Sequence, residues 1–178
     1  MTSILDRPEF RADFDRLAAV TLNPERHTAA NARAHSLAVA ARVAALAARN
    51  GVGEPQRQKL VDLALLHDIG KIGGTANASA SVDLLPRYGI ADAELIELVR
   101  LHDLNLPWHL SRLRGEAPTD KAWRKLARRV DMRLLCLFMV ADRVDCPGGW
   151  RQNAAVTWFL DEVAQRQLLV PPLELDDA

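Results

Sequence analysis

The chain has 178 residues, 49% of them apolar, and its 23 basic and 23 acidic side chains leave a formal net charge of zero. This composition excludes a generally disordered chain, and the charge balance gives no overall attraction to nucleic acid or to an acidic membrane. Cys136 and Cys146 are too few for a disulfide scaffold or a four-thiolate zinc site, so we expect reduced thiols in a cytoplasmic protein. The longest apolar run, residues 134–141, is far shorter than the roughly 20 residues that span a bilayer, so no membrane is expected as a partner.

Alanine, leucine and arginine dominate the chain, and alternating β-branched runs do not occur, so the sequence predicts an all-α fold. In chain order, helices are expected at residues 8–20, 25–49, 55–68, 77–86, 91–103, 119–144 and 150–168. Residues 104–118 contain three helix breakers and are expected to be mixed. We predict a single domain over residues 1–178, with a core of about 25–147 to which the helices at 8–20 and 150–168 are additions.

Polar side chains follow apolar helices at several points. The run LVDLALL leads into His67 and Asp68, and the run LLCLFMVA leads into Asp142. An ionised carboxylate buried without a partner costs several kcal/mol, so each must be paired or bind a metal. Because imidazole and carboxylate are ligands of divalent metals, and because His35 and the pair His102-Asp103 repeat the pattern, the sequence favours an internal metal site.

Each of these residues also has a structural alternative when it is taken alone. His35 could be a satisfied core histidine, and His102 with Asp103 could be a helix end that faces water. Asp68 could pair with Lys71, and Asp142 could pair with a nearby arginine. The joint pattern favours the metal, because four separate explanations would be needed to replace it.

The stretch LLHDIGK resembles the signature of the HD superfamily, the metal-dependent phosphohydrolases that are named after a His-Asp doublet. Their pattern is a histidine on one helix, the doublet at the end of another helix, and an aspartate on a later one. It matches His35, His67 with Asp68, and Asp142 in VADRVD, and the resemblance covers about residues 25–147. The resemblance implies a helical HD-domain bundle in which these four side chains bind a divalent ion, whether manganese, iron, cobalt, nickel, zinc or magnesium.

The segment after the doublet departs from one branch of that family. Residues 74–80, GTANASA, are distantly similar to the HD module of bacterial tRNA nucleotidyltransferases, but Thr75 and Ala76 replace the histidine and glutamate of that pattern. His102 matches the next histidine of the pattern. One ligand fewer implies a single-metal site, and it argues against a di-iron oxygenase, which needs more ligands.

The expected function is hydrolysis of a phosphate ester, of a nucleotide or a similar small molecule, by a metal-activated water. The predicted catalytic residues are Asp68, Lys71 as a point charge on the phosphate, and His102 as proton donor to the leaving group or as a phosphate contact. Alternatively, Lys71 is a surface lysine just past a helix end and His102 is a structural histidine, and neither takes part in catalysis. The alternative function is a non-catalytic module of the HD fold that binds a metal or a nucleotide, or that contacts RNA.

Two further features bear on partners. Residues 112–133 carry an excess of basic side chains, and Lys121, Lys125, Arg128 and Arg129 recur near helical spacing, which could face RNA. A solvated helix face is the favoured interpretation, so nucleic acid is a possible but not a favoured partner. His27 precedes His35 by two helical turns and could line the pocket, and the alanine-rich outer helices would permit a homodimer.

Overall fold

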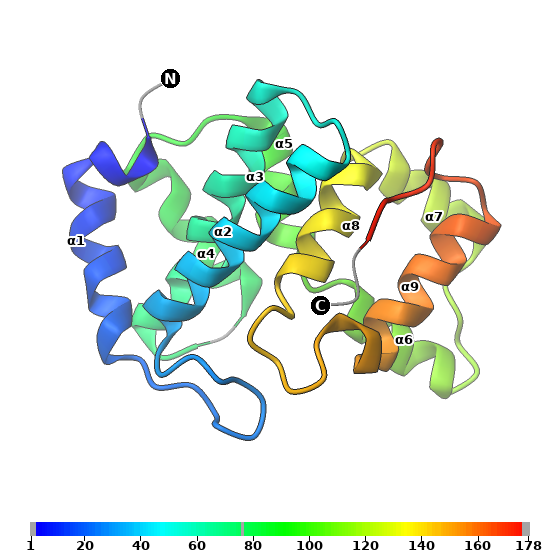
Figure 1. Ribbon diagram of the computed structural model, residues 1–178, viewed down its shortest axis with the longest axis horizontal. Helices are drawn as coiled ribbons and strands as arrows, with labels where there is room; N and C mark the ends of the chain where they lie inside the picture. The colour runs from blue at the N-terminus through cyan, green and yellow to red at the C-terminus, as the bar shows by residue number, and fades with distance from the viewer. Residues whose placement is uncertain (1–2, 76, 176–178) are drawn as a thin grey trace.

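The computed structural model describes residues 3–75 and 77–175. In these residues the chain forms helices, with no strand beyond an isolated antiparallel bridge between Thr21 and Asn31. The α-helices are α1 (Pro8–Arg16), α2 (Ala32–Arg49), α3 (Glu54–Leu66), α4 (Ala78–Leu84), α5 (Ala93–Leu101), α6 (Asn105–Leu113), α7 (Asp120–Ala127), α8 (Met132–Ala141) and α9 (Ala154–Gln165) (Figure 1). Short 3-10 helices are η1 (Ile4–Asp6), η2 (Leu17–Ala19), η3 (Ile69–Gly73), η4 (Leu85–Tyr88) and η5 (Trp150–Gln152). The prediction of an all-α fold is confirmed.

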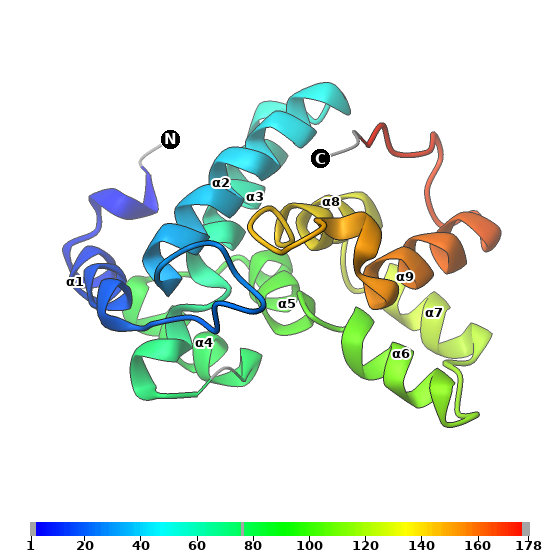
Figure 2. The same ribbon diagram turned by 60° about the horizontal axis from the view of Figure 1, so that its bottom comes forward.

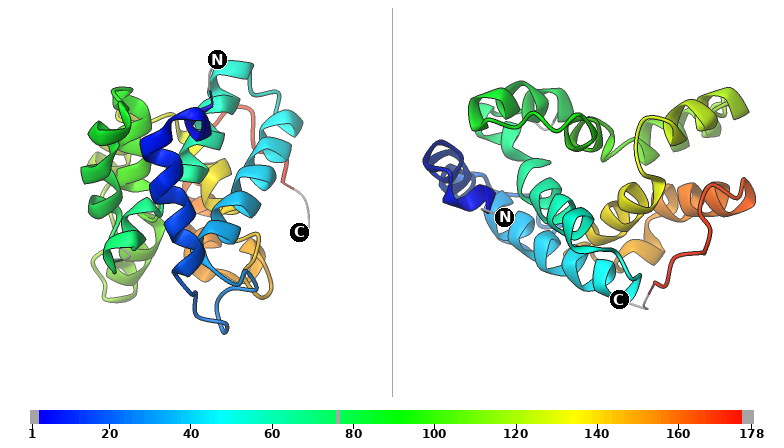
Figure 3. Two further views of the ribbon diagram at one scale, coloured as in Figure 1. Left: turned by 90° about the vertical axis from the view of Figure 1, so that its left-hand side faces the viewer. Right: turned by 90° about the horizontal axis from the view of Figure 1, so that it is seen from above.

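Three helices form the centre of the molecule. α2 and α3 pack along one another as a helical hairpin, and α8 packs against both. Figure 2 shows α4, α5 and α6 following one another along one face, and the view from above in Figure 3 separates them from the layer that contains α2, α8 and α9. α1 lies at one end of the molecule, against α2 and η3.

The helix α8 is apolar on all sides because it runs through the core. All ten of its residues except Arg133 are buried. α2 and α3 contribute Val39, Val43, Leu63 and Leu66 to the same core. A helix that is enclosed in this way can reach solvent only at its ends. A polar residue of α8 that contacts solvent must therefore lie at one of its termini.

The predicted start of the helix at residue 25 is wrong, because α2 begins only at Ala32. The side chain of Asn31 accepts a hydrogen bond from the backbone of Ala34 and caps the helix there, at 2.9 Å. The preceding segment forms a loop that the bridge between Thr21 and Asn31 closes. The sequence does contain the cap residue, but the alanine-rich pattern on both sides of it hides the boundary.

The predicted helix at 119–144 is also wrong, since the structure has two helices there. Asp131 caps α8 by accepting hydrogen bonds from the backbone of Arg133 and Leu134, at 2.7 and 3.3 Å. α7 has ended before it, at Ala127. Conversely, a helix that was not predicted occurs in the mixed region 104–118. This helix is α6, which accommodates Pro107 in its first turn.

The remaining helices were expected at about the right places. Several of them end earlier than predicted because a 3-10 turn follows, as η3 does after α3 and η4 after α4. Pro8 opens α1 as expected. No helix in the described part of the chain is long and apolar enough to cross a bilayer.

Candidate metal centre

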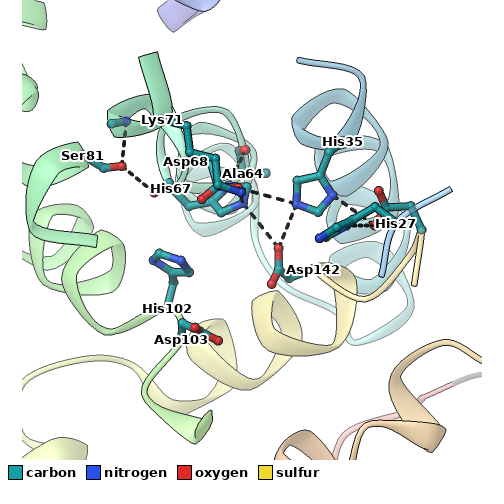
Figure 4. A network of polar contacts seen from close by, with 12 residues as sticks. His27, His35, Ala64, His67, Asp68, Lys71, Ser81, His102, Asp103 and Asp142 are labelled. Carbon is teal, nitrogen blue, oxygen red and sulfur yellow. Dashed lines mark hydrogen bonds and ion pairs between the residues drawn. The ribbon is translucent and has the colours of Figure 1, made fainter. Parts of the chain in front are cut away.

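The predicted site residues lie at helix ends that meet in the middle of the molecule. His67, His102 and Asp142 are the residues that directly follow α3, α5 and α8. Asp68 comes next after His67, and His35 lies in the first turn of α2. Figure 4 shows His35, His67, Asp68 and Asp142 pointing toward one another. The structure thus brings together the four side chains that the sequence nominated as ligands.

The spacing of their polar atoms suits a small cation. Nε2 of His35 and Nε2 of His67 lie 3.1 and 3.3 Å from Oδ1 of Asp142. Oδ2 of Asp68 lies 3.3 Å from Nε2 of His67 and 4.0 Å from Nε2 of His35. Neighbouring ligands about 2.1 Å from a metal stand roughly 3.0–3.4 Å apart in octahedral or tetrahedral coordination. A divalent ion therefore fits among these atoms with little movement.

Burial gives a second reason to place a cation there. His35 and His67 are 1% and 2% exposed, and Asp68 and Asp142 are 8% and 6% exposed. Nδ1 of His67 donates a hydrogen bond to the carbonyl of Ala64 at 2.9 Å, which leaves its Nε2 as the nitrogen that faces the cluster. This Nε2 is buried, and although oxygens of Asp68 and Asp142 lie 3.3 Å away, it makes no well-directed hydrogen bond among the described residues. A buried polar atom without a hydrogen bond is costly, and a metal ion would satisfy it.

The ion pairs around the cluster keep both carboxylates ionised. Burial raises the pKa of Asp68, but the neighbouring His67 and Lys71 hold that pKa well below its usual range. Burial likewise opposes ionisation of Asp142, yet Arg143 and the two histidines hold its pKa well below the usual value. Nζ of Lys71 lies 2.5 Å from Oδ2 of Asp68, and Nη2 of Arg143 lies 2.5 Å from Oδ2 of Asp142. Each carboxylate thus turns one oxygen to a cationic side chain.

The carboxylates act on the histidines in return. Burial lowers the pKa of His67, but Asp68 and Asp142 outweigh it and raise the pKa to about 10. Burial also opposes protonation of His35, but Asp142 and Asp145 raise its pKa. In the metal-free protein, protonated histidine rings thus supply part of the positive charge that a bound metal ion would bring to the two carboxylates.

Asp145 is a member of the site that the sequence reasoning missed. It is buried, and its Oδ1 lies 3.1 Å from Nδ1 of His35 and 3.2 Å from Nδ1 of His27. His27, His35 and Asp145 form a second group of potential metal-binding side chains beside the first. A carboxylate on the far nitrogen of a ligating histidine commonly fixes the orientation of its ring. The sequence did contain a hint of this role, because Asp145 follows the predicted ligand Asp142 by three residues in VADRVD.

The turn that carries the doublet is fixed from behind by α4. The hydroxyl of Ser81 donates to the carbonyl of His67 at 2.7 Å and accepts from the backbone of Gly70 at 3.0 Å. A Cβ on Gly70 would lie 2.6 Å from the backbone nitrogen of Ser81, so only glycine allows this approach. The glycine of HDIG is thereby explained as a packing requirement.

The cluster forms the floor of a cavity of about 530 Å³, whose walls include Lys71, His102, Asp103 and Arg143. Nδ1 of His102 donates to the carbonyl of Val99 at 2.8 Å, and its ring centroid lies 5.2 Å from that of His67. Burial, and the positive charge of His67, lower the pKa of His102. The two further residues predicted to be catalytic, Lys71 and His102, therefore both border the cavity.

Two predicted features lie away from this floor. Thr75, which replaces a histidine of the two-metal pattern, is exposed, and Ala76 lies outside the described residues. The basic stripe is interrupted by the break between α7 and α8, and Arg129 pairs with Glu97. A continuous basic helix for RNA is therefore not present in this part of the chain.

The family model of the HD domain matches residues 33–146 of the chain. This chain belongs to the HD-domain family. The matched residues extend from the first turn of α2 to just past α8, so they include His35, His67, Asp68 and Asp142. HD domains typically bind divalent metals and occur in metal-dependent phosphohydrolases. No curated protein and no solved structure matched the chain. The finer likeness to the HD module of tRNA nucleotidyltransferases stays a prediction.

Proposed function

We propose that this HD-domain protein is a metal-dependent phosphohydrolase that cleaves a phosphate ester of a nucleotide or a similar small molecule. The observation that carries the proposal is the buried convergence of His35, His67, Asp68 and Asp142 at 3.1–4.0 Å on the floor of an open cavity. A cavity of this volume is of the size that takes small-molecule ligands.

His35, His67, Asp68 and Asp142 would hold the cation through Nε2 of each histidine and one oxygen of each carboxylate. A divalent ion bound there lowers the pKa of a water and offsets the negative charge of a phosphate oxygen. In the hydrolysis that follows, water adds to phosphorus and the ester oxygen leaves with a proton. Two neighbouring side chains, Lys71 and His102, would bind the phosphate and transfer the proton.

Lys71 is the proposed contact for the substrate phosphate. Its ammonium group lies at the cavity wall against Oδ2 of Asp68, and a lysine has three donors, so it can bind a phosphate oxygen while keeping that ion pair. Asp68 then has two roles, as a ligand and as the anchor of this ammonium group.

His102 is the proposed carrier of the proton that the leaving oxygen takes. With the proton of Nδ1 directed to Val99, its Nε2 is the nitrogen left for the cavity. In the neutral ring this Nε2 carries a lone pair, so the ring must first accept a proton there before it can donate one. General acid catalysis by His102 thus requires that Nε2 first accept the proton that the attacking water releases, and the same proton then leaves on the ester oxygen.

The test is a hydrolysis screen of the purified full chain, with a metal analysis of the same preparation. We expect turnover of members of a nucleotide panel in Mn²⁺, Co²⁺, Ni²⁺ or Mg²⁺, and its loss by at least about 100-fold in His67→Ala, Asp68→Ala and Asp142→Ala. His109→Ala and Asp83→Ala are matched controls, because neither residue borders the cavity. No turnover of any member would contradict the enzymatic proposal, and retained metal would then favour the binding module.

A further inference from the structure

A second hollow of about 360 Å³ adjoins the metal cavity. The two share the lining residues Arg26, His27 and Lys71. The other walls of this side hollow come from the loop before α2 and from the turn after η3, at Val20, Thr21, Leu22, Asn23, Gly74 and Thr75. Its volume lies within the range of about 300–1,000 Å³ that small-molecule pockets occupy. A ligand seated on the metal floor can therefore extend past Lys71 into a separate space.

The two cavities differ in charge. The metal cavity includes acidic side chains, among them Asp68, Asp142 and Glu25, whereas the side hollow has no carboxylate among its described lining residues. Arg26 and Lys71 stand at the boundary, so the side hollow is bordered by two cations. This charge pattern suits an anionic group of the ligand.

Arg26 differs from the other two cationic side chains that line the metal cavity. Lys71 and Arg143 are each held by a carboxylate of the floor. Arg26 is exposed, and among the described residues no carboxylate forms an ion pair with it, Glu25 included. Its planar guanidinium group is therefore available for bidentate contact with phosphate oxygens.

The loop that presents Arg26 is held in place by the polar site itself. The carbonyl of Asn23 accepts hydrogen bonds from the backbone of Arg26 and of His27, both at 3.0 Å. The backbone of Thr28 donates to the carbonyl of Asp145 at 2.7 Å, and the side chain of His27 reaches the carboxylate of the same residue. The position of Arg26 is thus tied to the segment that follows α8.

We propose that Arg26 binds a second phosphate of the substrate at the entrance to the side hollow, while Lys71 at the boundary contacts the hydrolysed phosphate. The substrates are then molecules with a second phosphate next to the hydrolysed ester, such as nucleoside diphosphates, in which the ester bond to the sugar is cleaved and both phosphates leave together as diphosphate. This inference rests on the proposed function, because it places the hydrolysed phosphate on the metal floor. Arg26 acts in it as a residue that determines specificity, and no part of the hydrolysis step depends on it.

The test uses two probes that cannot be hydrolysed further, inorganic phosphate and methylenediphosphonate. Each is titrated calorimetrically into the full chain in Mn²⁺, for the wild type, Arg26→Gln, Arg26→Lys and the control Arg124→Gln, whose side chain is exposed and lines neither cavity. The binding of Mn²⁺ by the probe in solution is the same in every titration, so differences between variants report the protein.

We expect Arg26→Gln to weaken methylenediphosphonate about 10-fold or more, which corresponds to one lost charge-assisted contact, and to leave phosphate within about 2-fold. Arg26→Lys should recover part of the loss, and Arg124→Gln should match the wild type. Equal weakening of both probes, unchanged binding of both, or no binding of methylenediphosphonate by the wild type would each overturn the inference. Failure of the hydrolysis screen overturns the proposed function instead, since these titrations need no turnover.

Discussion

The polar centre between α2, α3 and α8 and the aromatic cluster between α6, α7 and α9 are stabilised by different physics. In the aromatic cluster, Trp123 lies with its ring centroid 4.8 Å from that of Trp108 and 4.9 Å from that of Phe159. Such packing stabilises the fold by burial and by edge-to-face ring contacts. The polar centre instead buries two carboxylates beside two histidines, and a buried ion pair contributes little net stability after its dehydration. One region should therefore govern unfolding, and the other should govern binding.

The largest expected effect is on unfolding, from Trp123→Ala. Trp123 is 1% exposed, and removing a buried tryptophan costs about 3–5 kcal/mol. Urea denaturation should show this loss, while the affinity of the folded protein for Mn²⁺ stays as in the wild type. Trp123→Phe, which keeps a ring at the site, should lose less. A loss below about 1 kcal/mol would show that the cluster does not govern stability.

Gly70→Ala should affect both unfolding and metal binding, because this glycine lies where α4 packs behind the doublet. The added Cβ meets the backbone of Ala80 and Ser81 at 2.7 and 2.6 Å, and overpacking of this kind costs about 1–3 kcal/mol. We expect a lower urea midpoint and weaker binding of Mn²⁺, because Ser81 holds the carbonyl of His67. Gly73→Ala is the matched control, since its Cβ would meet nothing within 4 Å. Equal behaviour of the two variants would argue against the close approach.

Asp145→Asn should affect metal binding more than it affects unfolding. An amide keeps the shape of the side chain but removes the charge beside His35 and His27. Loss of such a partner behind a ligating histidine typically weakens metal binding about 10- to 100-fold. Calorimetric titration with Mn²⁺ measures the loss, and Asp83→Asn, at an exposed position, is the control. An unchanged affinity would mean that Asp145 does not position His35.

The smallest expected effect is a pH dependence at the surface, remote from both regions. Burial would raise the pKa of Asp92, but the backbone N–H of Leu95 and the ammonium group of Lys59 hold it below the usual 3.8. A lowered pKa in the folded state means that the carboxylate stabilises the protein above about pH 4, and that this contribution is lost as the pH falls through the folded pKa.

Asp92→Asn isolates that contribution, because asparagine is also a good N-terminal cap for α5. Thermal unfolding should show the wild type more stable at pH 7 by less than about 1 kcal/mol, with the difference closing below pH 3.8. A difference that does not change between pH 7 and the lowest pH at which both variants stay folded would assign it to the cap and not to the charge.

Sequence reasoning located the centre better than it located the helix boundaries. His67 and Asp142 were found because each directly follows an apolar run at the end of a helix, and a buried helix end can present a polar residue to a common interior. Asp145 was missed because its partner His35 lies on α2, 110 residues earlier in the chain, and only the folded structure shows that contact. The break before α8 was missed because the apolar pattern continues through Val130, which is buried although it is not helical.

Three helices direct their carboxyl termini at the site, since His67, His102 and Asp142 are the residues that follow α3, α5 and α8. The unpaired carbonyl groups at a helix C-terminus carry about half a negative elementary charge, so the main chain alone produces a field that attracts a cation. The amino ends of α2, beside His35, and of the short η3, which follows Asp68, have the opposite sign. The main chain thus favours a positive ion where the three carboxyl ends meet, and it favours an approaching anion on the side of these two amino ends.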